Sequence, residues 1–114
     1  MSKRAELIEK YHKEMDKLGI KNVDAGLFEK VVIGCGPSIY NADSSTVSGS
    51  DEKELATVKN NFLIKKLGLE DTPELDKALD AVIEKYGRSN RTKYRAVVYY
   101  LLTLHFNKQA VYDK

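Results

Sequence analysis

Four basic side chains crowd the predicted start of the last helix of this chain: Arg88, Arg91, Lys93 and Arg95. A helix N-terminus carries the positive end of the helix dipole, so it favours acidic side chains by a few tenths to about 1 kcal/mol each. Backbone N–H groups at such a terminus, together with guanidinium groups, can hold a phosphate, a nucleic-acid backbone or an acidic partner. The sequence therefore predicts an anion-binding site built from Arg88, Ser89, Asn90, Arg91, Lys93 and Arg95.

A second interpretation of these basic residues needs no ligand. The acidic first turns of neighbouring helices, Asp51–Glu52 and Glu70-Asp71-Glu74, would compensate them across the fold. Under both interpretations the basic stretch lacks interleaved aromatic residues suited to base stacking, because Tyr94 belongs to an apolar stripe. Sequence-specific recognition of nucleic acid is therefore not expected.

Cys35 is the single cysteine, and as a nucleophile it would need a nearby base. The two histidines, His12 and His105, are the candidates for that base. Cys35 ends an apolar stripe and lies near a helix C-terminus, where the dipole disfavours a thiolate. We therefore expect a structural thiol, with a thiol-dependent enzyme as the less favoured alternative.

Metal and cofactor motifs are weak in this sequence. One cysteine and two distant histidines offer neither the number nor the spacing of ligands that zinc requires, so no metal is predicted. The stretch 34–39 begins like a dinucleotide fingerprint, but Ile39 replaces its last glycine and no βαβ unit surrounds it, so no cofactor is predicted. We expect His12 to be exposed on a charged helix, and His105 to be partly buried near the last carbonyl groups of its helix.

Five segments show apolar residues at helical spacing, each bounded by residues typical of helix ends. Their predicted N-terminal caps are Asp24, Ser50 or Asp51, Thr72 before Pro73, and Ser89 or Asn90, the first helix having no clear cap. Their predicted ends lie at or near Gly19, Gly36, Gly68 and Gly87. Between residues 34 and 50, five serines, a threonine and three glycines predict an irregular segment rather than a long helix.

The last predicted helix carries apolar residues on nearly every side: Ala96, Val97, Val98, Tyr99, Tyr100, Leu101, Leu102, Leu104 and Phe106. Such a helix belongs at the centre of a bundle rather than on its surface. We predict a single all-α domain over residues 1–114, with five main helices, the last one central and the serine-rich segment packed over it.

Composition agrees with a globular protein of one domain. The chain has 114 residues, 42% of them hydrophobic and 32% charged. The lone Cys35 favours a reducing cytoplasm, and the first six residues show no secretory signal. The longest apolar run, Ala96 to Leu102, is shorter than the roughly 20 residues of a membrane span. Residues 88–114 carry six Lys and Arg against one acid, whereas residues 1–87 carry 13 against 16, so the C-terminal quarter is the cationic part.

One stretch of the sequence resembles a known family. Four pieces of it are similar to the bacterial domain of unknown function 2853: Asn41 to Val47, Ser50-Asp51, Glu54-Leu55, and Val58 to Leu69 with its Lys65-Lys66-Leu67-Gly68-Leu69 ending. The resemblance extends from about Gly36 to the Tyr99-Tyr100-Leu101 helix. It implies a small all-helical bacterial protein and brings no activity, cofactor or catalytic residue.

Three classes of function remain open at this point. We favour a non-enzymatic cytoplasmic binding or interaction domain. A homodimer is one form of this prediction, because the apolar helix with Tyr94, Tyr99 and Tyr100 can have more apolar surface than one small core covers. The alternative is a binder of anions or of a nucleic-acid backbone through the basic residues. The third is an enzyme that uses the Cys35 thiol.

Overall fold

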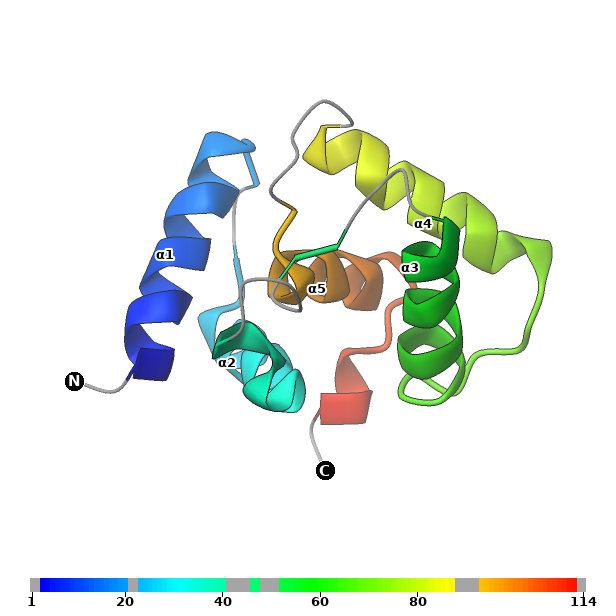
Figure 1. Cartoon of the computed structure of the whole chain (residues 1–114), viewed down its shortest axis with the longest axis horizontal. Coiled ribbons are helices and arrows are strands. Elements are labelled where there is room, and N and C mark those ends of the chain that lie inside the picture. The colour runs from blue at the N-terminus through cyan, green and yellow to red at the C-terminus, as the bar shows by residue number, and fades with distance from the viewer. Residues whose placement is uncertain (1–2, 21–22, 41–45, 48–51, 88–92, 113–114) are drawn as a thin grey trace.

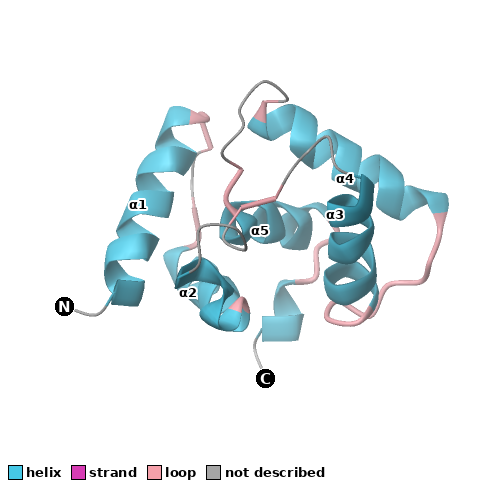
Figure 2. Ribbon diagram, viewed as in Figure 1, coloured by secondary structure: helices cyan, strands magenta, loops and turns pink. Residues whose placement is uncertain are grey.

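The computed structural model describes residues 3–20, 23–40, 46–47, 52–87 and 93–112. Within these residues the chain forms the α-helices α1 (Lys3–Lys17), α2 (Ala25–Gly34), α3 (Glu52–Thr57), α4 (Pro73–Tyr86) and α5 (Arg95–His105). A π-helix, Val58–Ile64, continues α3, and two 3-10 turns span Gly36–Tyr40 and Gln109–Tyr112. The described part contains no strand, so the all-α class is confirmed (Figure 2).

Helix α5 lies in the middle of the molecule, with α1 and α2 on one side and α3 and α4 on the other (Figure 1). It contacts α1, α2 and α4. Its buried residues are Ala96, Val97, Val98, Tyr100, Leu101, Leu102 and Thr103. The prediction of a central apolar last helix is therefore confirmed.

Local signals at several helix ends act as predicted. Asp24 caps α2, because its side chain accepts a hydrogen bond from the Leu27 N–H at 3.1 Å. Gly68 and Gly87 have φ values of 73° and 105°, a region that favours glycine, and they follow the π-helix and α4. Pro73 starts α4, but the Thr72 side chain makes no capping hydrogen bond, so that part of the predicted cap is wrong.

The start of α5 differs from the prediction. The helix begins at Arg95 rather than just after Ser89 or Asn90. Tyr94 is extended, with φ −65° and ψ 129°, because it forms an antiparallel bridge with Thr46. Next to this bridge the Val47 N–H donates to the Lys93 carbonyl at 2.7 Å. A segment distant in sequence thus holds Tyr94 out of helical geometry.

The third predicted helix is present, but it is an α-helix only over Glu52–Thr57 and a π-helix over Val58–Ile64; its predicted caps Ser50 and Asp51 lie outside the described residues. After Thr57 the hydrogen bonds widen to the π pattern, in which the Leu67 N–H donates to the Phe62 carbonyl at 2.9 Å. Val58, Phe62 and Leu63 are buried as predicted, whereas Leu55 is half-buried. Such π-turns are rare and occur frequently at functional sites.

Two tyrosines tie the helices together through their phenol groups. The Tyr86 hydroxyl donates to the Glu14 carboxylate at 3.1 Å and accepts the Tyr94 N–H at 3.1 Å, which joins α4, α1 and the residue before α5. The Tyr100 hydroxyl accepts the Asp24 N–H at 2.9 Å, which joins α5 to the start of α2. These contacts give buried aromatic rings a fixed orientation.

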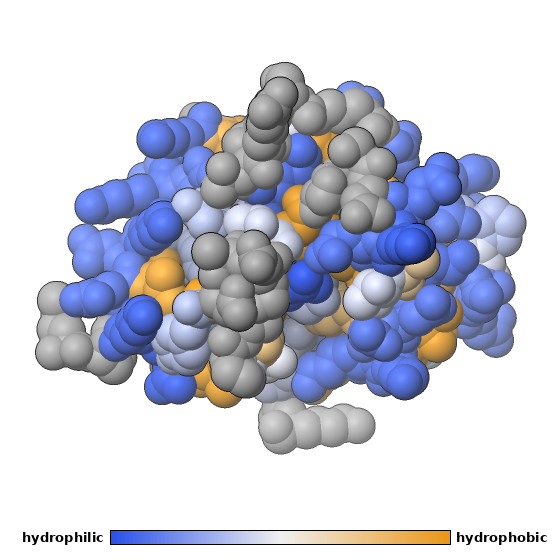
Figure 3. Space-filling model, in the orientation of Figure 1, coloured by the Kyte–Doolittle hydropathy of each residue, from blue (hydrophilic) through white to orange (hydrophobic). Residues whose placement is uncertain are grey.

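The described surface is mainly hydrophilic on the face that Figure 3 shows. Among the described large apolar residues, Ile33, Tyr40 and Leu104 are exposed, whereas Tyr100 is buried and Tyr99 is packed against the core. The radius of gyration is 13.1 Å, against about 13 Å for a compact chain of this size. No described helix is long and apolar enough to cross a membrane. Self-association stays a prediction.

Removal of a core leucine from α5 should destabilise the protein strongly. We expect Leu101→Ala to cost roughly 2 to 5 kcal/mol of unfolding free energy, because the Leu101 side chain is only 5% exposed and leaves a cavity. Urea denaturation followed by far-UV circular dichroism measures this loss. Leu104→Ala, at a position 37% exposed in the same helix, is the matched control and should cost less than about 1 kcal/mol. Equal losses would contradict the central placement of α5.

The Tyr86 hydroxyl should contribute to stability beyond the packing of its ring. Tyr86→Phe keeps the ring but leaves the Tyr94 N–H without its acceptor, so we expect a loss of about 1 to 3 kcal/mol. Tyr40→Phe removes a hydroxyl from an exposed tyrosine and should leave the melting temperature nearly unchanged. If both variants melt like the parent protein, the bridging role of Tyr86 is wrong.

Candidate functional site

The structure describes two of the six predicted anion-binding residues. Arg88, Ser89, Asn90 and Arg91 lie outside the described residues. Lys93 is buried, with 3% exposure, and the Arg95 side chain is 13% exposed. Neither Lys93 nor Arg95 therefore presents a cation on an open surface, and the predicted site at the amides of Ser89 to Arg91 stays a prediction.

Arg95 is compensated by an acidic helix start, as the second interpretation predicts, although by a different residue. Its Nη2 donates to Glu54 Oε1 at 2.7 Å, and Glu54 lies in the first turn of α3. Its Nη1 donates to the Tyr99 hydroxyl at 2.9 Å. Burial alone would lower the pKa of the Arg95 guanidinium, but the contacts with Tyr99 and Glu54 outweigh it and hold the pKa above its ordinary value.

A cavity of about 430 Å³ opens beside this ion pair. It is bounded by the end of α2, the π-helix, the outer side of α5 and the C-terminal 3-10 turn. We call it the cationic cavity, because among the residues that the structure describes its lining contains two basic side chains and no carboxylate: Gly34, Cys35, Thr57, Asn61, Phe62, Lys66, Arg95, Tyr99 and Tyr112.

Aromatic rings hold both cations of the cationic cavity. The Lys66 Nζ lies 5.0 Å from the centre of the Tyr112 ring, and the Arg95 guanidinium carbon lies 5.6 Å from the centre of the Tyr99 ring. Phe62 stacks on Tyr99, with ring centres 4.0 Å apart and planes 11° from parallel. Cation–π contacts of this length are attractive. The cavity therefore combines flat apolar walls with positive charge.

The last 3-10 turn brings Tyr112 to the cavity wall. Tyr112 shares a side-chain hydrogen bond with Thr103 of α5. A Cβ atom on Gly34 would meet Tyr112 Cε1 at 3.4 Å, so glycine lets the ring approach the end of α2 closely. Burial, together with the nearby Cys35 thiol, raises the pKa of the Tyr112 phenol.

Cys35 follows the last residue of α2 and lines the cationic cavity. It is half-buried rather than a fully buried core residue. Burial raises the pKa of its thiol from 9.0 to about 11, against a smaller lowering by the Arg95 charge. The thiol is therefore a poor nucleophile at neutral pH, which agrees with the expectation of a structural thiol.

Both histidine environments differ from their predictions. His12 is half-buried rather than exposed, and its ring lies 5.1 Å from the Phe28 ring. His105 is exposed rather than partly buried, because it occupies the last position of α5 beside the Phe106 ring at 5.1 Å. In the described part of the chain no three His, Cys, Asp or Glu side chains gather to hold a metal ion.

The sequence patterns did not identify several residues of the cationic cavity. Lys66 follows a helical segment, where a lysine ordinarily complements the negative end of the helix dipole, and Asn61 directly precedes the core residues Phe62 and Leu63. Tyr112 follows the end of α5, where Asn107 has a positive φ of 56° and turns the chain. A tyrosine placed after an apparent helix end is the one signal that pointed to a further packed turn.

Comparison with known proteins gives one match. A family model described as "Protein of unknown function (DUF2853)" matches residues 10–110. None of the curated proteins compared with the chain matches it. The description of the family names no activity, so function must be argued from the cavity itself.

The Cys35 thiol should react slowly in the native protein. At pH 8, a thiol with a pKa of about 11 is deprotonated in roughly one molecule in a thousand, compared with about one in ten at the ordinary pKa of 9.0. We expect iodoacetamide to label the folded protein about a hundredfold more slowly than the urea-unfolded protein, with a rate that still rises with pH above 9. Fast native labelling that levels off below pH 8 would instead support the thiol-enzyme alternative.

Proposed function

The chain belongs to the DUF2853 family of proteins of unknown function, and we propose that it is a binding domain that takes a small organic anion into the cationic cavity. The observation that carries this proposal is the described part of the lining, which contains Lys66 and Arg95 and no carboxylate. Glu54 pairs with Arg95 but does not line the cavity. Because the Glu54 carboxylate lies 2.7 Å from Arg95 Nη2 and offsets its charge, the attraction for a negative group comes mainly from Lys66.

The size of the cavity supports a small molecule as the ligand. Its volume of about 430 Å³ falls within the roughly 300 to 1,000 Å³ of typical small-molecule sites. The rings of Phe62, Tyr99 and Tyr112 offer flat apolar surface, while Lys66 and the Asn61 amide offer hydrogen-bond donors. This combination suits a carboxylate or phosphate that is attached to a planar apolar group.

The chemistry of Cys35 favours binding without catalysis. Its raised pKa opposes a thiolate nucleophile, and Arg95 is held in place by Glu54 and Tyr99. We also propose a cytoplasmic location, because the chain has a single cysteine. We propose a bacterial source because of the family resemblance. Binding of a nucleic-acid backbone by the stretch 88–95 remains a prediction without a supporting contact.

Phenyl phosphate is a suitable probe, with benzylamine as the cationic compound of similar shape. We expect phenyl phosphate to bind the full chain, to shift amide signals of Cys35 and Tyr112 in NMR spectra, and to slow labelling of Cys35. Added salt should weaken this binding, because it screens the attraction between charges. Benzylamine should produce none of these effects.

Two adjacent lysines provide a matched pair of variants. Lys66→Glu places a negative charge at the cavity and should weaken phenyl phosphate binding by roughly tenfold, or about 1.4 kcal/mol. Lys65→Glu changes the net charge equally, but Lys65 does not line the cavity, so binding should persist. Equal weakening by both variants, or equal binding of benzylamine, would refute a specific anion site.

A further inference from the structure

The Tyr99 hydroxyl has a hydrogen that the rest of the described structure does not use. Arg95 Nη1 lies 2.9 Å from this hydroxyl, and because a guanidinium group has donors only, the Tyr99 oxygen is the acceptor in their hydrogen bond. A phenol has one hydrogen of its own to donate as well. Within the described part of the chain, no hydrogen bond is donated by the Tyr99 hydroxyl.

This unused donor belongs to a side chain of the cationic cavity that is already held in position. Tyr99 lines the cavity and is half-buried. Its ring stacks on Phe62 with ring centres 4.0 Å apart, and the Arg95 guanidinium carbon lies 5.6 Å from its centre. A ligand therefore meets a donor whose oxygen has a fixed place, which lowers the entropy cost of a hydrogen bond to it.

The Tyr99 phenol keeps its hydrogen at neutral pH. Burial raises its pKa above the ordinary value of 10.0, and the opposite effect of the Arg95 charge is smaller. The nearby Cys35 thiol acts in the same direction as burial. Arg95 also strengthens the donor, because a hydroxyl that accepts a hydrogen bond is polarised and donates a stronger one.

Tyr112 lines the same cavity, but its hydroxyl is bonded within the protein. The Thr103 hydroxyl donates its single hydrogen to the Tyr99 carbonyl at 2.8 Å. In the hydrogen bond that Thr103 shares with Tyr112, the Tyr112 hydroxyl is therefore the donor. Of these two phenols, Tyr99 is the one whose hydrogen is available to a ligand.

We propose that the Tyr99 hydroxyl donates a hydrogen bond to the anion in the cationic cavity, and so selects a carboxylate on a planar group over a sulfonate. This inference rests on the proposed binding of an organic anion. Lys66 attracts any anion, because the attraction between charges has no direction, whereas a hydrogen bond depends on the acceptor. A sulfonate has the same single charge as a carboxylate but spreads it over three oxygens, so it accepts weaker hydrogen bonds.

Benzoate and benzenesulfonate test this selection, because each has one negative charge on one aromatic ring. In NMR titrations we expect the full chain to bind benzoate several-fold more tightly than benzenesulfonate. Tyr99→Phe should weaken benzoate roughly tenfold through the lost hydrogen bond, and benzenesulfonate by less than about threefold. If the hydroxyl serves only to hold Arg95 in place, Tyr99→Phe weakens both ligands equally.

Tyr112→Phe is the matched control, because it removes a hydroxyl from the same cavity that is already bonded to Thr103. It should leave the ratio of the two affinities as in the parent protein. Melting temperatures show that both variants are folded, and Tyr99→Phe keeps the ring that stacks on Phe62.

The outcomes separate this inference from the proposed function. If the parent protein binds neither benzoate nor phenyl phosphate, both fail. If it binds benzoate and benzenesulfonate equally well, or if Tyr99→Phe leaves the ratio of their affinities unchanged, the role of the Tyr99 hydroxyl alone is overturned.

Discussion

The fold depends on the need to bury α5 from every side. A helix of eleven residues with apolar side chains around its whole axis cannot lie on a surface, so other helices must enclose it. The contacts of α5 with α1, α2 and α4 meet this need. The polar groups that are buried with α5 have hydrogen-bond partners. The Thr103 hydroxyl donates to the Tyr99 carbonyl at 2.8 Å, and no buried side-chain N or O atom in the described part lacks a partner.

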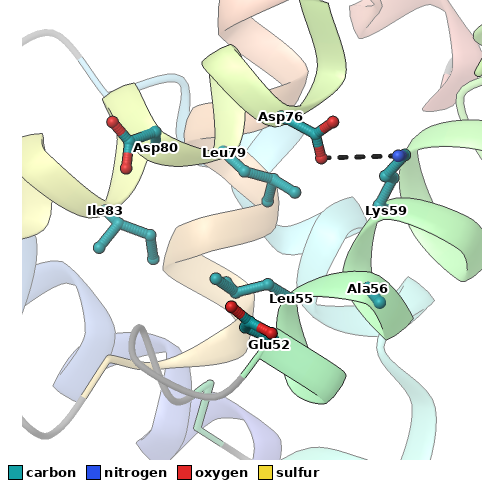
Figure 4. A pocket seen from close by; sticks show the side chains of 8 residues that line it. All are labelled: Glu52, Leu55, Ala56, Lys59, Asp76, Leu79, Asp80 and Ile83. Carbon is teal, nitrogen blue, oxygen red and sulfur yellow. Dashed lines mark ion pairs between the residues drawn. The ribbon is translucent and has the colours of Figure 1, made fainter. Parts of the chain in front are cut away.

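The π-helix that continues α3 lines two separate concavities. Lys59 lines a concavity between α3 and α4 (Figure 4), whereas Asn61 and Phe62 line the cationic cavity. Phe62 is also fixed against Tyr99 of α5, so the segment cannot rotate without breaking an aromatic stack. A widened helical turn thus separates two concavities within a few residues.

Sequence patterns predicted the elements better than the places where distant segments meet. Asp24, Gly68 and Gly87 act locally, so helix ends at these residues could be read from their chemistry alone. The start of α5 could not, because Thr46 pairs with Tyr94 from another part of the chain and overrides local capping signals. The cationic cavity was missed for a similar reason: Lys66, Arg95 and Tyr112 come from three separate elements.

The pairing of Thr46 with Tyr94 also bears on the order of folding. These residues are 48 positions apart (94 minus 46), and closing a loop of that length costs about 3 kcal/mol of chain entropy. One bridge and one hydrogen bond do not offset this cost, so we expect the contact to form after collapse of α5 into the core has brought the two segments together. The start of α5 is therefore set late, by tertiary structure that is already in place.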